Sequence, residues 1–438
     1  MFPLSIPTDK TAHNLSSMYL SESPAPGVEG PTRYRWFRSW FTVPPNVWYL
    51  GLTSLLTDVS SEMVTSVLPV YLVLHLRLSP VAFGALDGLY NGITAVTRWG
   101  SGVIADRWGR HKEVAASGYA MSALCRIGLL AAGREWTLLA GAILADRLGK
   151  GIRTAPRDAL ISLSAPPRGL AHAFGVHRAM DAAGALMGPL LAVGLLSLAP
   201  SGFDLVFVTS FAVALVGLGV LLLFVENVRA PATGEHTVRR PSLQSAFGLL
   251  ARRDYRTLVI AASGLALLTV SDAFVYLALE AGLQFNAAVF PLLYVGTASS
   301  YLLLAIPAGR LADRLGRSRL FLLGHVALLV LYGVLILADG AAVGAALAVL
   351  LLGAYYAATD GVLAALASGM LPVTLRGSGL ALLSTATSVA RLGASVGFGW
   401  LWTLWGRETA TTSFGVALLI GLALSVVALG RVRPSSDD

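Results

Sequence analysis

The sequence predicts an all-α membrane protein in which twelve transmembrane helices form two pseudo-symmetric six-helix bundles. Three observations support this fold class: an apolar composition, twelve apolar segments of spanning length, and polar motifs that recur in the two halves of the chain. Of the 438 residues, 55% are hydrophobic and only 13% are charged, whereas a soluble domain carries about 25% charged residues. A chain with so few charges cannot cover a water-facing surface, so we expect its outer surface to contact lipid.

The apolar segments are about 20 residues long, which is enough for a helix to cross the hydrocarbon core. We predict a disordered cytoplasmic tail over 1–45, an N-terminal six-helix bundle over 46–225, a cytoplasmic linker over 226–256, a C-terminal six-helix bundle over 257–431 and a cytoplasmic tail over 432–438. The predicted spans are 47–74, 81–103, 113–132, 136–161, 171–198, 204–225, 257–279, 287–308, 319–338, 341–368, 377–404 and 411–430.

The basic residues gather in the loops that twelve spans would place on one side of the membrane. Arginines are frequent near 106–112 and 310–319, in the linker and in the C-terminal tail, whereas the opposite loops carry few bases, namely Arg77, Arg134 and Arg407. Positively charged loops stay in the cytoplasm. We therefore expect both termini there and the protein in the plasma (inner) membrane. Because the net charge of +8 lies mostly in such loops, we expect no nucleic-acid partner.

One polar motif occurs twice. Its first copy has Gly102, Asp106, Arg107, Gly109 and Arg110, and its second copy repeats these types as Gly309, Asp313, Arg314, Gly316 and Arg317. Two further matches, Arg168-Gly169 with Arg376-Gly377 and Gly184-x-x-x-Gly188 with Gly393-x-x-x-Gly397, follow at nearly the same spacing. The repeat indicates two homologous halves, a common plan among transporters that hold their substrate between the halves.

These motifs resemble those of the major facilitator superfamily. The duplicated motif is similar to the family's loop between helices 2 and 3 and between helices 8 and 9. Ile143-x-x-x-Arg147-x-x-Lys150-Gly151 resembles its helix 4 motif, with Lys150 where glutamine is usual. Gly184-x-x-x-Gly188-Pro189 resembles the helix 5 motif of antiporters, although Ala192 and Val193 stand where two glycines usually end it. The resemblance implies transport by alternating access, with the duplicated loops acting as gates. An alternative for their bases is that they only fix the topology.

Charged side chains inside spans cost about 2.5–3.5 kcal/mol each and should face the bundle interior. Asp58 and Glu62 are four residues apart, hence on one helix face, and two such carboxylates could take up and release a proton during transport. Asp181 can pair with a base of helix 4, and the resemblance adds Arg147 of that helix to the proton-coupling candidates. The alternative is that these acids are held in permanent salt bridges.

Seven further charged residues inside the spans are candidates for substrate binding: Arg98, Lys150, Arg153, Arg178, Asp272, Asp360 and Arg391. Arg126 also lies inside a span, and its long side chain could instead extend outward to the membrane interface. Arg391 falls near the middle of its span, where an arginine needs an acid or an anionic ligand beside it. Asp272 and Asp360 are the acids we expect as its partners, and substrate contact is equally compatible with the pattern.

The leading hypothesis is a proton-coupled secondary transporter that exports a small organic solute. A proton symporter that imports a nutrient or a metal chelate is the alternative, and a membrane receptor that binds without transport is less favoured. The sequence contains no metal-ligand cluster, no Gly-x-Ser-x-Gly motif and no phosphate-binding loop, so we expect no enzyme, metal or cofactor. The expected partners are a small-molecule substrate, protons and the lipid bilayer, the energy source is a proton gradient, and a monomer is expected.

Overall fold

The computed structural model describes residues 43–89, 97, 110–133, 135–166, 170–199, 202–228, 248–337, 342–372 and 375–430. Every regular element in these ranges is helical, and no strand occurs in them. Seven of the described helices are long and apolar enough to cross a membrane. The all-α class predicted from the sequence is therefore confirmed.

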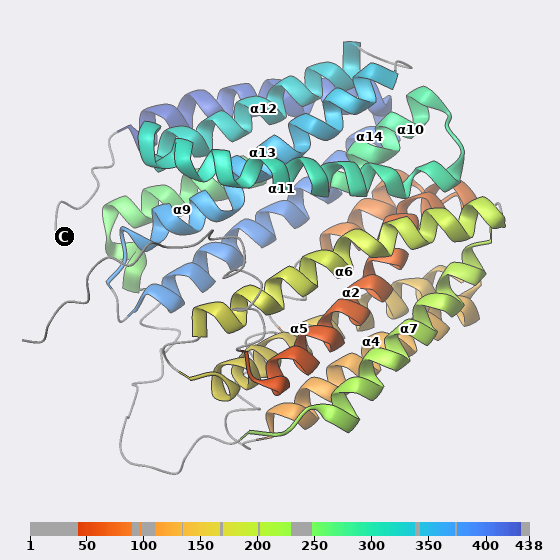
Figure 1. Ribbon diagram of the computed structural model, residues 1–438. Helices are drawn as coiled ribbons and strands as arrows, with labels where there is room; N and C mark the ends of the chain where they lie inside the picture. The colour runs from red at the N-terminus through yellow and green to blue at the C-terminus, as the bar shows by residue number, and fades with distance from the viewer. Residues whose placement is uncertain are drawn as a thin grey trace, which may run out of the picture. The chain divides into compact units, whose positions relative to one another are not determined.

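The helices up to residue 224 are called here the first group. They are α2 (Pro45–Val70) with the π-helical turn η1 (Tyr71–His75), the apolar helix Pro80–Leu89, α4 (His111–Ala132), α5 (Trp136–Ser164), α6 (Leu170–Leu198) and α7 (Phe203–Phe224). Within this group α2 packs against α6 and α7, and α4 packs against α5 (Figure 1).

The elements from residue 249 onward are called the second group. They are η3 (Leu249–Ala251), α9 (Arg253–Ala266), α10 (Asp272–Leu283), η4 (Ala287–Val289), α11 (Pro291–Leu315), α12 (Arg317–Leu337), α13 (Ala342–Ser368) and α14 (Arg376–Leu429). Here α13 packs against both α11 and α12, and α9 packs against α14 (Figure 1). The two groups meet where α6 contacts α11 and η4 and where α2 contacts α10 and α11.

The prediction of one continuous helix over 257–279 is wrong. The chain leaves the helix after Ala266 and resumes it at Asp272. The hydroxyl of Tyr332 in α12 stabilises the backbone of this break. It accepts a hydrogen bond from the amide of Val270 at 2.8 Å and donates one to the carbonyl of Leu268 at 2.9 Å. Non-helical backbone inside a membrane protein needs such partners, since no water replaces them.

Two other boundaries differ from the prediction. The turn η3 (Leu249–Ala251) and the start of α9 at Arg253 both lie inside the segment 226–256 that we predicted as linker. The segments predicted as 377–404 and 411–430 are two helices that follow each other within α14 and meet at a kink at Gly406, where the backbone is non-helical with φ 82°. Only glycine adopts such a positive φ readily, so the chain bends there without an intervening loop.

Candidate functional site

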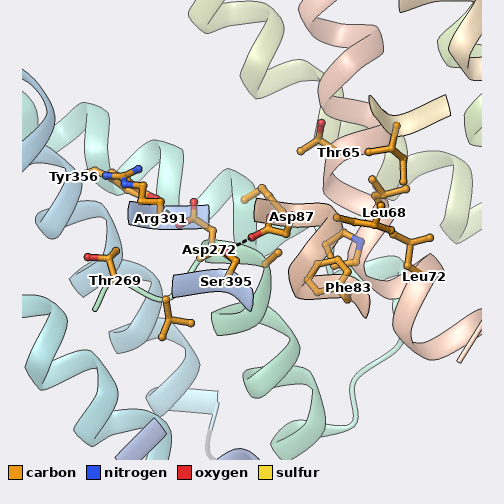
Figure 2. Close-up of a pocket in the computed structure, with 17 residues that line it drawn as sticks. Thr65, Leu68, Leu72, Phe83, Asp87, Thr269, Asp272, Tyr356, Arg391 and Ser395 are labelled. Carbon is orange, nitrogen blue, oxygen red and sulfur yellow. Dashed lines mark hydrogen bonds between the residues drawn. The ribbon is translucent and has the colours of Figure 1, made fainter. Parts of the chain in front are cut away.

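A cavity with both apolar and polar walls is lined by residues of both groups (Figure 2). The first group contributes residues of α2, η1, helix Pro80–Leu89 and α5, and the second contributes the break before α10, the start of α10, and residues of α11, α13 and α14. Its volume is about 190 Å³. The charged and hydroxyl-bearing side chains that line it are Thr65, Asp87, Thr269, Ser271, Asp272, Tyr294, Tyr356, Arg391 and Ser395.

Asp87 joins the two groups inside this cavity. The hydroxyl of Ser395 in α14 donates to the Asp87 carboxylate at 2.7 Å, across 308 residues of sequence. Asp87 is absent from the candidates that the sequence suggested, although it gives the same signal as Asp58, a carboxylate in the middle of an apolar segment. Ser395 gives no such signal, because a serine costs little inside a helix.

Asp272 and Arg391 both line the cavity, as the intramembrane-charge argument suggested. Asp272 accepts a hydrogen bond from the hydroxyl of Tyr356 in α13. Arg391 donates to the hydroxyl of Tyr355 at 3.5 Å, and neither Asp272 nor Asp360 lies within 4.0 Å of its guanidinium. The expected ion pair is therefore absent from this described part of the site, and Asp360 lies exposed outside the cavity lining.

One end of the cavity is closed by the packing of helix Pro80–Leu89 against α14. A Cβ atom at Gly84 would collide with the carbonyl oxygen of Ser395, and one at Gly88 would lie 3.0 Å from that of Leu392. The amide of Val81 also donates to the hydroxyl of Thr403 at 3.1 Å. The two glycines thus let the backbone of helix Pro80–Leu89 approach that of α14 closely, as small residues commonly do between helices of membrane proteins.

Aromatic rings fill the space beside these glycines. Phe83 from the first group stands edge-on to Phe274 of α10 at a centroid distance of 5.1 Å, and Phe274 contacts Phe398 and Trp402 of α14. Edge-to-face pairs at this distance are favourable. The closed end is thus held by backbone proximity and by a shared aromatic cluster.

A second polar cluster lies within the first group, around one face of α5. Asp146 binds two guanidinium groups, those of Arg126 in α4 and of the adjacent Arg147, the latter at 2.5 Å. Arg126 is 2% exposed and also donates to Ser61 at 2.9 Å. The sequence left open whether Arg126 reaches outward to the interface. The structure places it inside the bundle instead, because α4 and α5 pack closely. Arg147, a proton-coupling candidate, faces Asp146.

The acids of α2 face the next turns of α5. Asp58 lies 3.8 Å from Arg153, which also donates to Ser122 at 3.1 Å and packs over the ring of Tyr119. No ion pair within 4.0 Å joins Glu62 or Lys150 to another described residue. The predicted pair Asp58 and Glu62 thus contains one paired acid and one acid with no cation within 4.0 Å among the described residues.

Asp181 of α6 completes this cluster. Arg157, Arg178 and His177 approach its carboxylate at 3.9, 3.9 and 3.7 Å. Arg178 is 63% exposed, whereas Arg157 is buried and also holds Asp158 at 2.9 Å. Several positively charged or polar groups therefore lie near the carboxylate of Asp181, but none is at close hydrogen-bond distance. Arg157 of α5, the fourth predicted span, is one of them, as expected.

The motif Gly184-x-x-x-Gly188-Pro189, which resembles the family's helix 5 motif, lies in α6 and packs against α2. A Cβ atom at Gly184 would lie 2.5 Å from the carbonyl oxygen of Leu55, and one at Gly188 would lie 2.7 Å from that of Val59 and 2.9 Å from the Cβ of Glu62. Pro189 follows, buried within α6. The two glycines let α6 approach the segment of α2 that carries Asp58 and Glu62.

The duplicated loop motif is described only in part. Arg98, Gly102, Asp106, Arg107 and Gly109 lie outside the described residues, and Arg110 is exposed at the start of α4. In the second copy, Gly316 has φ 93° and separates α11 from α12. Arg317 opens α12 and donates to the carbonyl of Ala365 in α13 at 3.1 Å. Gly309 and Arg314 are exposed, and the side chain of Asp313 is outside the described part.

Known proteins resemble the chain over most of its length. It is 28% identical over 391 residues to an uncharacterized MFS-type transporter of Methanocaldococcus jannaschii, which covers 86% of this chain and 94% of the relative. An uncharacterized protein of Mycobacterium tuberculosis is 25% identical over 388 residues, with 88% of this chain and 93% of the relative covered.

Solved transporters share the fold. The nucleoside transporter NupG superposes with a TM-score of 0.71 at 18% identity, over 88% of this chain and 98% of that structure. A POT family transporter in complex with a peptide gives 0.72 at 12% identity, over 90% and 99%. The sequence model of the Major Facilitator Superfamily matches residues 50–299. The chain therefore belongs to the Major Facilitator Superfamily, and it is a multi-pass membrane protein with the fold of a secondary transporter.

Proposed function

We propose that this chain exports a small organic solute by proton-coupled alternating access, with the cavity between the two groups as the cargo site. One observation carries the proposal: the cavity contains charged and hydroxyl-bearing side chains, is lined by both groups and is closed at one end by contacts between them. Contacts of this kind can open as one group moves against the other, and the cavity then becomes accessible from the other side.

Proton coupling is assigned to Asp58, Glu62 and Asp181, with Arg147 as a neighbouring base. Asp58 and Asp181 face arginines at 3.8–3.9 Å rather than at close hydrogen-bond distance. Carboxylates held so loosely can exchange a cation partner for a proton at modest cost, whereas Asp146 is bound by two guanidinium groups. The proton gradient supplies the energy, and no cofactor is required.

The proposed location is the plasma (inner) membrane with both termini in the cytoplasm, and a monomer is the proposed working unit. In that orientation the end closed by Gly84 and Gly88 faces outward. The exposure of Arg178 within a predicted span and of Asp360 then fits a state open to the cytoplasm. The duplicated loops would form the cytoplasmic gate.

The test combines a screen with a flux measurement. Purified protein is screened by thermal shift at acid and alkaline pH against organic cations, organic anions, sugars, amino acids and siderophores, because a bound ligand raises the melting temperature. Cargo-driven proton movement is then followed in liposomes with an internal pH dye. Ligand binding that strengthens as pH rises supports antiport, and binding that strengthens as pH falls supports the symporter alternative.

The variant for the coupling role is Asp58→Asn with Glu62→Gln. We expect this double variant to keep its melting temperature and cargo binding but to lose cargo-driven proton movement. The matched control is Asp204→Asn with Glu408→Gln, two exposed acids at helix ends. Proton movement that persists at the wild-type rate in the first variant would remove Asp58 and Glu62 from the mechanism.

A further inference from the structure

Two opposite charges line the cavity without forming an ion pair. Asp272 is the first residue of α10 and Arg391 lies in α14, and both side chains belong to the lining (Figure 2). They are near enough for their charges to interact, yet no carboxylate oxygen of a described residue lies within 4.0 Å of the Arg391 guanidinium. Opposite charges attract more strongly where water is scarce, so other contacts must hold these two apart.

Two neighbouring tyrosines of α13 provide those contacts. Tyr356 donates a hydrogen bond to the Asp272 carboxylate, and Arg391 donates one to the hydroxyl of Tyr355 at 3.5 Å. The two rings contact each other with their centroids 5.2 Å apart, and Tyr355 is 2% exposed. Because packing fixes the rings, it also fixes the two charges that they contact, and the gap between these charges stays open.

Both charges have unused hydrogen-bonding capacity. A carboxylate offers several acceptor positions and a guanidinium several N–H donors, but each of these two side chains makes a single hydrogen bond to the described residues. A charge in a water-poor site is costly unless it is paired and hydrogen-bonded. A ligand that satisfies both must present a cation to Asp272 and an anion to Arg391. Asp87, the third charged residue of the lining, accepts from Ser395 and is not needed for this match.

The rest of the cavity sets the size and the body of such a ligand. Its volume of about 190 Å³ is below the roughly 300–1,000 Å³ of sites for drug-sized molecules. Much of the remaining wall is aliphatic or aromatic, and Leu68, Leu72, Phe83 and Leu86 belong to it. A matching ligand is therefore small, carries its two charges close together and has an apolar side chain.

We propose that the cavity binds a small zwitterion of the α-amino acid type, with its ammonium group at Asp272, its carboxylate at Arg391 and an apolar side chain against the aliphatic and aromatic wall. This inference rests on the proposed transport function and specifies its cargo. The bound zwitterion completes the charge pair that the tyrosines hold apart, and it connects α10 with α14.

The test uses probes from which one charge at a time is deleted. L-leucine is compared with 3-methylbutylammonium, which lacks the carboxylate, and with 4-methylpentanoate, which lacks the ammonium group. L-phenylalanine, 2-phenylethylammonium and 3-phenylpropanoate form a second series. Binding to the full chain in detergent is measured by calorimetry. We expect at least one of the two amino acids to bind about tenfold or more tightly than both of its fragments, because hydrogen bonds between charged groups are the strong ones.

Two variants distinguish contact with the ligand from a structural role. Arg391→Gln should weaken binding of the amino acid at least about tenfold and remove its preference over the ammonium probe. Asp272→Asn should weaken it similarly and remove the preference over the carboxylate probe. Combining a variant with a probe that lacks the matching group measures their interaction, as a double-mutant cycle does. Arg391→Lys should restore part of the affinity.

The matched control Asp254→Asn neutralises an exposed acid at the start of α9 and should change nothing. Melting temperatures show that each variant is folded. Binding of neither amino acid, or binding of a fragment as tight as that of its amino acid, would overturn the zwitterion proposal. Preferences that persist in Arg391→Gln and Asp272→Asn would overturn it as well. These results would leave the proposed transport function intact, because that function is tested without any probe, by the access of a cavity residue from the two sides of the membrane.

Discussion

Replacing Gly84 with alanine perturbs the closed end of the cavity, because the added methyl group would meet backbone atoms of α14 rather than a side chain that could change its rotamer. The added Cβ atom would meet the carbonyl oxygen of Ser395, would lie 3.1 Å from its carbonyl carbon and 3.3 Å from the ring of Phe274. Backbone atoms of α14 cannot rotate away. The helix Pro80–Leu89 must therefore separate from α14, or the protein must favour a state in which the two are already apart.

The size of the effect follows from these distances. Carbon atoms attract best at about 3.5–4.0 Å, so relief of the contacts requires a separation of roughly half an ångström or more. Overpacking of this kind costs about 1–3 kcal/mol, which corresponds to a 5- to 150-fold change in an equilibrium constant. We expect the population of the state with this end open to rise by that factor.

The assay is a distance measurement by electron spin resonance across the closed end, between labels at Leu74→Cys and Glu408→Cys. Both positions are exposed, and Cys125→Ser removes the single native cysteine. Gly84→Ala should add a longer distance to the distribution. Gly141→Ala is the matched control, because its Cβ would meet no atom within 4 Å. Identical distributions for Gly84→Ala and wild type would refute the reasoning.

Three further predictions concern stability and gating. Asp146→Asn should destabilise the protein by about 3–5 kcal/mol, because it leaves the buried Arg126 without its acid; an unchanged melting temperature would contradict this. Tyr332→Phe should cost about 1–3 kcal/mol by freeing the amide of Val270, which hydrogen exchange at the break would detect. Asp106→Asn should shift the conformational balance, and unaltered distances across the cytoplasmic face would count against a gating role for the loop.

Where the structure describes the chain, the sequence was sufficient to predict most helices and their approximate limits, because segment length and hydropathy decide whether a helix crosses the membrane. It did not predict the break at 267–271. The break is held by the hydroxyl of Tyr332, which comes from another helix, and no local pattern reveals such a partner. Gly406 is a different case, because the predicted gap between 404 and 411 already places an interruption there, and only the absence of a loop between the two helices was not predicted.

The charged residues were visible in the sequence, but their partners were not. Arg126 lies beside Asp146 only because α4 packs against α5, and Arg391 faces Tyr355 rather than the acids expected from charge alone. Asp87 could have been found by the argument that found Asp58. Its pairing with Ser395 could not, because the two residues are 308 positions apart and only the tertiary fold brings them together.

The most direct test of alternating access is the reactivity of one cysteine in the cavity from each side of the membrane. Ser271→Cys changes a cavity-lining hydroxyl to a thiol in the Cys125→Ser background, and a membrane-impermeant thiol reagent is applied to sealed vesicles of each orientation. Leu215→Cys, on the exposed apolar surface of α7, is the control for a residue in contact with lipid. The account predicts labelling of Ser271→Cys from both sides and little labelling of the control. Labelling from one side alone would contradict transport through this cavity and would favour a receptor that binds without moving its ligand.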